Sequence, residues 1–429
     1  MGPDEANDIA QPGSGWRRWL VRALLVLLAL ILSGLAYVWT TRDRIAGDLI
    51  DDALAESGVE ARYDIASIGP RRQIIENVVI GDPAAPDLTI GRVVAVVGYG
   101  FGAPSIDRIE LTNPRLFGSL RGGKLSFGAL DPLIFAESEE PQALPSIDVT
   151  IAGGGARIET DYGPVGAFFE GAGRIDDGFA GKLAVTAPGA GVEGCSAAVA
   201  TAYGEVAMED GAPRFTGPVR LRQVACNGAS VDRIDIAAQL GADADLAKLD
   251  ASLDVMARGL GSGGGSAREL SGTARLSLGS DALVLEHDLT ARGVATDYAQ
   301  FGSLGADGSL RSARGLTQSS WNAQITGEGV AIGTGAQEAL ADARAAGAGT
   351  LAEALLAKLE RNLVPATRAA ELEGSVVWRQ SDTAQSIVIP EARLYSTEGE
   401  TLLALSRFSW RPGMEGNGEG ALSGNFLTG

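Results

Sequence analysis

The feature that most restricts the fold of this chain is a long series of segments in which every second residue is apolar. They include IDVTI, KLAVT, VRLRQV, DRIDIAA, SLDVMA, ARLSL, ALVLEH and WNAQIT, spread between residues 147 and 326. Successive side chains of a β-strand point to opposite faces, so each segment predicts a strand with one apolar and one polar face. The series therefore predicts a β-rich chain.

Turn-prone clusters separate these segments, at residues 152–156, 176–178, 209–211, 259–266 and 307–309. Strand and turn signals recur about every 10 to 15 residues, which is typical of an antiparallel meander and predicts about sixteen strands. The 59 glycines and the aromatic content of only 6% fit strands joined by tight turns better than a compact α/β enzyme.

One segment breaks the strand pattern. Thr334 with Gln337, and Thr350 with Glu353, have the spacing of capping boxes at helix starts. The second is followed by an apolar stripe at every fourth residue that ends near Pro365, formed by Leu351, Leu355, Leu359 and Leu363. We predict a helical hairpin inserted between strands.

Near the N-terminus, an uncharged apolar run extends from Ala23 to Trp39. With the residues just before it, the run reaches the roughly 20 residues that cross a bilayer. A cleavable signal peptide is the alternative, but the run ends in Tyr-Val-Trp and lacks an A-x-A cleavage pattern. We expect an uncleaved membrane anchor.

The charges beside this run predict its orientation. Arg17, Arg18 and Arg22 precede it, whereas Arg42 and Arg44 follow it. Arginine and lysine favour the cytoplasmic side, so the chain should be N-in and C-out in an inner membrane, with its bulk in the periplasm. The apolar spacing after the anchor predicts an amphipathic helix that packs on protein.

Composition and motifs exclude several functions. The net charge of −19 argues against nucleic-acid binding, which needs a basic surface. No nucleophile elbow, HExxH, CxxC or Walker loop occurs. The single histidine, His287, shares a strand face with Leu283 and Leu285, which indicates a structural role. We expect no enzyme activity, catalytic residue, metal site or cofactor.

The two cysteines, Cys195 and Cys226, both fall in the β-rich part. Outside the reducing cytoplasm they could form a disulfide, but two unpaired buried thiols fit the sequence equally well. Sequence spacing alone leaves the two alternatives open.

Two stretches directly behind the anchor carry a family resemblance: residues 63–93, with the element PDLTIGRV, and residues 106–133, with the step NPRL and the ending SFGALDPL. They resemble the YdbH-type proteins of the AsmA-like group, which includes TamB. The resemblance implies a periplasmic protein, anchored in the inner membrane, whose curved sheet forms an apolar trough that conducts phospholipids between the two membranes. It implies no catalytic residues.

Together these observations predict a mainly β fold: an N-terminal transmembrane helix, then an extended curved antiparallel β-sheet shaped as a groove, with a helical hairpin insertion. The boundaries are a disordered cytoplasmic tail (1–15), the transmembrane helix (16–40), the amphipathic helix (41–60), a β-rich groove domain (61–334), the helical insertion (335–370) and a continuation of the β-rich domain (371–429). Because the last apolar segment has no polar cap, we expect an N-terminal portion of a longer protein.

The apolar positions of the alternating segments are the candidate groove lining. They are Ile147, Val149, Ile151, Leu183, Val185, Val219, Leu221, Ile234, Ile236, Leu253, Val255, Leu276 and Leu278. The expected partners are phospholipids, the inner membrane through the anchor, and an outer-membrane or periplasmic protein at the distal end. The alternative function is an envelope scaffold or assembly factor that binds proteins through a sheet edge. An exported hydrolase has no residue constellation to support it.

Overall fold

The computed structural model describes residues 60–98, 105–135, 144–192, 194–245, 247–313, 318–366, 369–381, 383–414 and 416–422. The predicted tail, transmembrane helix and almost all of the predicted amphipathic helix lie outside these ranges. Among the described residues, no helix has both the length and the apolar character needed to cross a bilayer.

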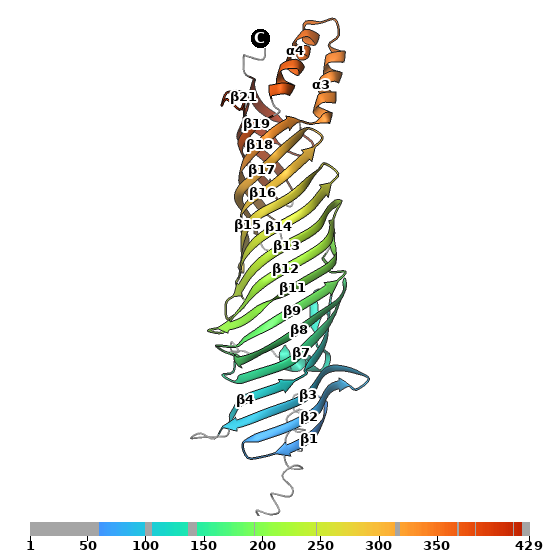
Figure 1. Cartoon of the computed structure of the whole chain (residues 1–429), viewed down its shortest axis with the longest axis vertical. Helices are drawn as coiled ribbons and strands as arrows, with labels where there is room; N and C mark the ends of the chain where they lie inside the picture. Colours follow the sequence, from blue (N-terminus) through green and yellow to red (C-terminus); the bar gives the residue numbers. More distant parts are fainter. Residues whose placement is uncertain are drawn as a thin grey trace, which may run out of the picture.

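The described residues form one 22-stranded sheet, so the estimate of about sixteen strands was too low. At about 4.8 Å between neighbouring strands, the stack is on the order of 90 Å long. Figure 1 shows it running from β1 at one end to the last strands at the other. The strands are β1 (Ala61–Ile68), β2 (Arg72–Asp82), β3 (Ala85–Gly98), β4 (Ser105–Thr112), β5 (Arg115–Arg121), β6 (Lys124–Ser126), β7 (Asp148–Thr160), β8 (Gly163–Arg174), β9 (Ala180–Pro188), β10 (Gly191–Val192), β11 (Cys195–Glu209), β12 (Ala212–Cys226), β13 (Ala229–Ala242), β14 (Leu249–Ser262), β15 (Gly265–Leu278), β16 (Ala282–Thr296), β17 (Ala299–Ala313), β18 (Ser319–Ile332), β19 (Ala370–Gln380), β20 (Gln385–Tyr395), β21 (Thr401–Trp410) and β22 (Asn417–Leu422).

From β7 onward nearly every strand pairs antiparallel with the strand before it in the sequence, as a meander requires. The exception to the predicted antiparallel pattern lies earlier, where β4 and β5 both pair parallel to β7. A parallel pair needs a connection that crosses the sheet. This crossover includes the short helices η1 (Gly128–Leu130) and α2 (Asp131–Ile134).

The predicted helical pair is confirmed as α3 (Thr334–Ala346) and α4 (Leu351–Ala366), joined by an Arg344–Glu360 ion pair at 3.3 Å. In Figure 1 the two helices project beyond the sheet near the C-terminal strands. The first predicted capping box is wrong, because the N-cap is Gly333 and makes no side-chain cap bond. At the second, Thr350 Oγ1 accepts the N–H of Ala352, while Glu353 accepts that of Gly349.

Two of the predicted turns are wrong. Residues 152–156 lie inside β7, where Gly153 adopts φ +66° and forms an irregularity in the β7–β8 pairing. Residues 307–309 lie inside β17, where Gly308 faces His287 and Ala323 on the neighbouring strands. In both places glycine removes a side chain within a strand, a role that composition alone does not distinguish from a turn.

A line of kinks crosses the sheet from β12 to β18. Alternate strands carry a residue with left-handed backbone along one row: Gln223, Gly259, Gly293 and Gly329, with φ between +50° and +64°. The pairs Val231–Leu260 and Arg233–Arg258 flank this row between β13 and β14 and place Asp232 opposite Gly259. We call this row the crease.

The crease shifts the alternation of the strands. In β13, Ile234 and Ile236 are shielded on one side of the crease and Val231 on the other, while Asp232 and Arg233 between them are both exposed. A left-handed residue that re-aims the strand in this way has the effect of a β-bulge, which bends the sheet locally. The apolar side chains on both sides of the crease therefore share one face of the sheet.

Candidate functional site

One face of this sheet is apolar over many strands, and its membership follows from directly opposed residues. Ile151 lies opposite Gly171, and Gly171 opposite Gly181. Further along, Val219 lies opposite Ile236, and Ile236 opposite Val255. Directly opposed residues of neighbouring strands point to the same side. We call this side the inner face and the other the outer face.

The strand pairing places the predicted lining residues on the inner face. Twelve of the thirteen lie in β7, β9 and β12 to β15 and are linked to one another through opposed pairs. Ile147 lies just before β7, where its carbonyl accepts the N–H of Ile175 at 3.1 Å. Sequence reasoning missed the inner-face residues beyond the crease, including Val224, Val231, Leu260 and Phe301, because the alternation changes phase there.

The inner face carries no Asp, Glu, Lys or Arg at the described strand positions from β7 to β19. Its titratable side chain in that region is His287, which is 9% exposed. The Nε1–H of Trp321 donates to Nε2 of His287 at 2.7 Å, and Nδ1 lies 3.1 Å from the carbonyl of Ala306. A neutral imidazole with its proton on Nδ1 satisfies both contacts, which agrees with the structural role expected for it.

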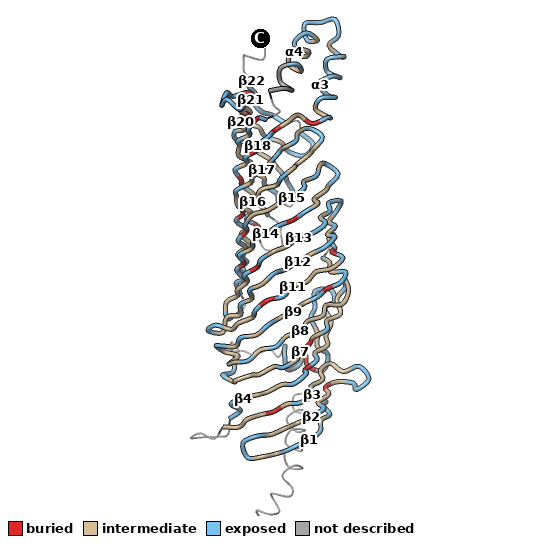
Figure 2. Tube along the Cα trace, viewed as in Figure 1, coloured by how far each residue is buried: buried red, intermediate tan, exposed pale blue. Residues whose placement is uncertain are grey.

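The inner face is shielded unequally. Its small residues are buried, among them Ala238 at 3% and Ala257 at 3% exposure, whereas the larger ones such as Val219 and Leu253 are half-buried. In Figure 2, half-buried and exposed residues alternate along most strands, and buried ones are sparse. Most of the described sheet therefore has no second layer packed on it, and its apolar face retains surface that a ligand could cover.

The outer face is polar and laced with ion pairs. Along the outside of the crease, Glu269 lies 3.5 Å from Arg258 and 3.3 Å from Arg292. Asp235 pairs with Arg233 at 2.6 Å, and this hydrogen bond holds the pKa of the Asp235 carboxyl below its ordinary value. Such exposed pairs add little stability each, but they keep this side of the sheet in water.

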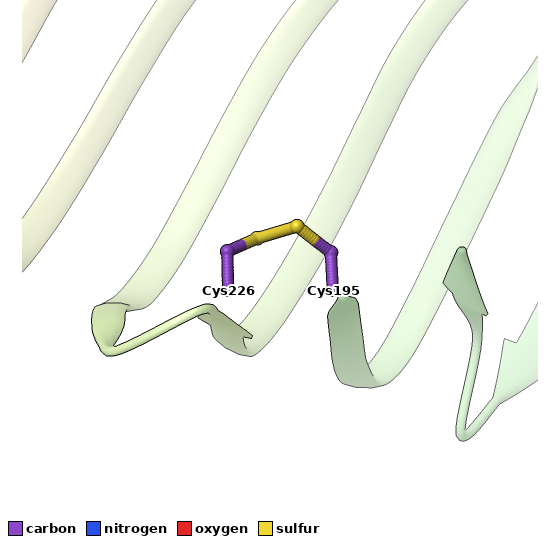
Figure 3. The surroundings of a disulfide bond; sticks show 2 residues. All are labelled: Cys195 and Cys226. Carbon is purple, nitrogen blue, oxygen red and sulfur yellow. A yellow bond between two sulfur atoms is a disulfide. The ribbon is translucent and has the colours of Figure 1, made fainter. Parts of the chain in front are cut away.

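Cys195 and Cys226 form a disulfide between directly opposed positions of β11 and β12 (Figure 3). The sequence left this pairing open, and the strand register decides it by bringing the two Cα atoms to 4.1 Å. The bond ties two neighbouring strands together near their ends.

At the N-terminal end the chain covers its own inner face. Leu130 of η1 packs with Ile80 in a cluster that includes Val78, Leu88 and Leu116. Opposed pairs link Ile80 to Leu88, Leu88 to Leu116, and Leu116 to Ala156, which belongs to the inner face. We call residues 127–135, which contain η1 and α2, the strap.

Hydrogen bonds fix the strap in place. The Asp131 carboxylate accepts from Ser126 Oγ at 2.6 Å and from the N–H of Phe127 at 2.5 Å, and these bonds lower the pKa of Asp131. Asp87 on β3 accepts the N–H of Ala129 at 2.9 Å. The strap is thus bonded both to itself and to the sheet.

The arrangement offers little for catalysis. Over the residues that the structure describes, no three His, Cys, Asp or Glu side chains gather as a metal site would require. What the site provides is a long apolar surface with a polar back. On this surface His287 is the titratable group at the described strand positions from β7 to β19, and its two ring nitrogens are engaged with Trp321 and Ala306.

A comparison with protein families agrees with this geometry. The model of the YdbH-like family, described as intermembrane phospholipid transport protein YdbH, matches residues 29–413. The chain belongs to the YdbH-like family. The resemblance in residues 63–133 is thereby confirmed and extends over most of the chain. No curated protein matches the chain closely enough to be named as a relative.

Membership of the YdbH-like family implies intermembrane phospholipid transport and an association with the cell envelope. It also places the chain in a family of transport proteins, not in a known enzyme family. The mainly β fold and the long curved sheet are those expected from the resemblance.

Proposed function

We propose that this protein is anchored in the inner membrane and shields phospholipid acyl chains on its inner face as they pass between the inner and outer membranes. The observation that carries the proposal is the absence of charged side chains from the described inner face between β7 and β19. A charge there would face an acyl chain without water, which is costly.

The energetics require no specific pocket. An acyl chain that leaves water for the inner face gains about 0.8 kcal/mol for each buried methylene. The headgroup can stay in solvent beyond the strand ends. Because no described strand position of this face between β7 and β19 carries Asp, Glu, Lys or Arg, a lipid would meet no charged barrier along it, which favours movement.

The anchoring part of the proposal rests on the sequence. The apolar run from Ala23 to Trp39 would hold the protein in the inner membrane, with the arginines before it in the cytoplasm. The sheet would then extend through the periplasm toward a protein at its distal end. The Cys195–Cys226 disulfide fits an oxidising compartment.

Photo-crosslinking and lipid analysis test the proposal. The full chain, extracted in mild detergent, should co-purify with phospholipid. A photoreactive amino acid at Val149 or Leu276 on the inner face should crosslink to it. The same probe at the adjacent outer positions Thr150 and Ser277 should not. Absence of co-purified phospholipid together with equal labelling of the two faces would refute the shielding role.

A scaffold function is the second candidate. Within the described residues, β22 pairs with β21 alone. An edge strand of a sheet can accept a strand from a partner protein. A stable protein partner bound at β22, with no lipid on the inner face, would favour this alternative.

A further inference from the structure

The inner face is covered near its N-terminal end by the strap and only half-buried on the strands that follow, such as β12 and β14, which raises the question of where a lipid first reaches it. We propose that the strap blocks the inner face where β1, β2, β3 and β5 meet, and that phospholipid loads laterally into an apolar hollow at the lip of the sheet beyond the strap. This inference rests on the proposed function and assigns the loading site within it.

The first step concerns the strap. Leu130 is 7% exposed and Ile80 9%, so the contact between them leaves no room for an acyl chain. The same cluster covers Val78, Leu88 and Leu116, which span three neighbouring strands. A lipid that moved from β1 along the half of the inner face next to β5 would have to displace this cluster and the hydrogen bonds of Asp87 and Asp131.

The second step concerns the hollow. A cavity of about 590 Å³ opens where the inner face meets the turns at the ends of β8, β11 and β13. Its volume lies in the range of small-molecule sites. The walls are almost wholly apolar and include Leu144, Ile151, Phe179, Phe215, Leu240 and Leu249. Leu144 comes from the crossover that also carries the strap, and it is 46% exposed.

The third step concerns the rim. Arg214 lines this hollow and also a second hollow on the outer face, together with Lys248 and the carboxylates of Asp243 and Asp250. Arg214 also pairs with Glu209 at 2.5 Å. Arg214 points to the outer face, since its neighbour Phe215 lies on the inner face, so its guanidinium stands on the other side of the lip from the hollow. The phosphate of an amphiphile whose tail lies in the hollow and whose headgroup bends over the lip would meet it there. Both signs of charge around it suit a zwitterionic headgroup.

Photo-crosslinking at three inner-face positions tests the order of contact. The full chain in native membranes, with ³²P-labelled phospholipid, would carry the probe at Val78 beneath the strap, at Phe215 in the hollow, or at Leu276 farther along. We expect Phe215 and Leu276 to label at least fivefold more strongly than Val78. Equal labelling at Val78 would overturn the block. No labelling at any position would overturn the proposed function itself.

A gain-of-labelling variant guards against misfolding. Phe127→Ala combined with Leu130→Ala should loosen the strap and raise labelling at Val78 while Phe215 stays labelled. If the probe at Val78 still fails to crosslink phospholipid in this variant while the probe at Phe215 does crosslink it, the strap is not what excludes lipid.

The rim residue has its own matched control. Arg214→Ala should lower labelling at Phe215 about threefold or more, and Arg214→Lys should restore most of it. Arg220→Ala removes an outer-face arginine that lies 3.3 Å from Asp235 and should change nothing. Unchanged labelling in Arg214→Ala would overturn the headgroup contact.

Discussion

The N-terminal end of the inner face and the strands that follow it differ in how far their apolar residues are covered. On β1, β2, β3 and β5, apolar residues pack against the strap, which supplies Leu130 and the ring of Phe127. The Phe127 ring stacks on the exposed Phe135 ring, with 6.2 Å between the ring centroids. On β12, β14 and β16, the larger inner-face residues are half-buried, and no second layer of described residues packs on them. The chain thus covers the apolar face with its own residues at the strap and leaves most of the described apolar face without such a cover.

The difference indicates that the uncovered region is stabilised without a deep core. The described chain buries few large side chains, and one of its two core clusters lies beneath the strap. Strand pairing, the crease and the disulfide must therefore carry much of the stability of β7 to β18. The predictions below test this contrast.

The largest effect is expected from a charge on the uncovered inner face. Leu253→Asp places a carboxylate where acyl chains would lie and should reduce co-purified phospholipid at least about tenfold, which corresponds to about 1.4 kcal/mol or more. The neighbouring Ser252→Asp on the outer face is the control. Lipid mass spectrometry on both purified variants makes the measurement, and similar losses in the two would contradict the assignment of faces.

The covered end should lose local stability when its contact is truncated. Leu130→Ala removes a buried side chain and should cost about 2–5 kcal/mol, as other large-to-small core changes do. Ile134→Ala, at a position that is 49% exposed, should cost far less. Hydrogen exchange of the Ile80 and Leu88 amides reports the change. Faster exchange at Val255 instead would mean that the two regions are not independent.

Reduction of the disulfide tests the uncovered region. Cys195→Ser combined with Cys226→Ser should lower stability by about 2–4 kcal/mol, because a closed loop is released in the unfolded chain. Thermal unfolding of the variant against the oxidised parent gives the value. An unchanged midpoint would show that strand pairing alone holds β11 to β12.

The crease should be sensitive to a single methyl group. Gly259 has φ +64°, and a Cβ there would come within 2.0 Å of the Asp232 carboxylate. Gly259→Ala should therefore cost about 1–3 kcal/mol through backbone strain and overlap. Gly263→Ala, in a turn where a Cβ meets nothing within 4 Å, is the matched control. Equal denaturant midpoints for the two variants would argue against the crease as a required bend.

The smallest effect is a pH dependence at the β8–β9 turn. A hydrogen bond from Arg174 lowers the pKa of Asp176 from 3.8 to about 2. A folded-state pKa below the unfolded value stabilises the protein above pH 4 and loses this contribution as the pH falls toward 2. Asp176→Asn should flatten the stability profile in that window, measured by acid titration of unfolding. An unaltered profile would assign the acid sensitivity to other carboxylates.

Much of this architecture was predictable because period-two alternation is local. Val219 and Ile236 each lie on the apolar side of their own strand. The pairing that turns both apolar sides the same way therefore places the two residues on one face of the sheet. The signals for the helices are also local, since the leucine stripe and Pro365 lie within one segment of the sequence.

The remaining features depend on contacts between distant residues. The strap lies on the inner face because β7 pairs parallel to β4 and β5, and nothing in residues 127–135 specifies that pairing. The crease was not predicted, because a left-handed backbone is uncommon for a residue other than glycine and nothing in the sequence around Gln223 indicates one. The disulfide followed only from the strand register.

The crease has a consequence for how such a chain can change in length. One left-handed residue occurs on every second strand from β12 to β18, so each pair of strands carries its own bend and the sheet keeps the same curvature along this stretch. As in other repetitive architectures, units of this kind contact only their neighbours. Duplication or loss of a hairpin would then lengthen or shorten the protein by about 10 Å without altering its width.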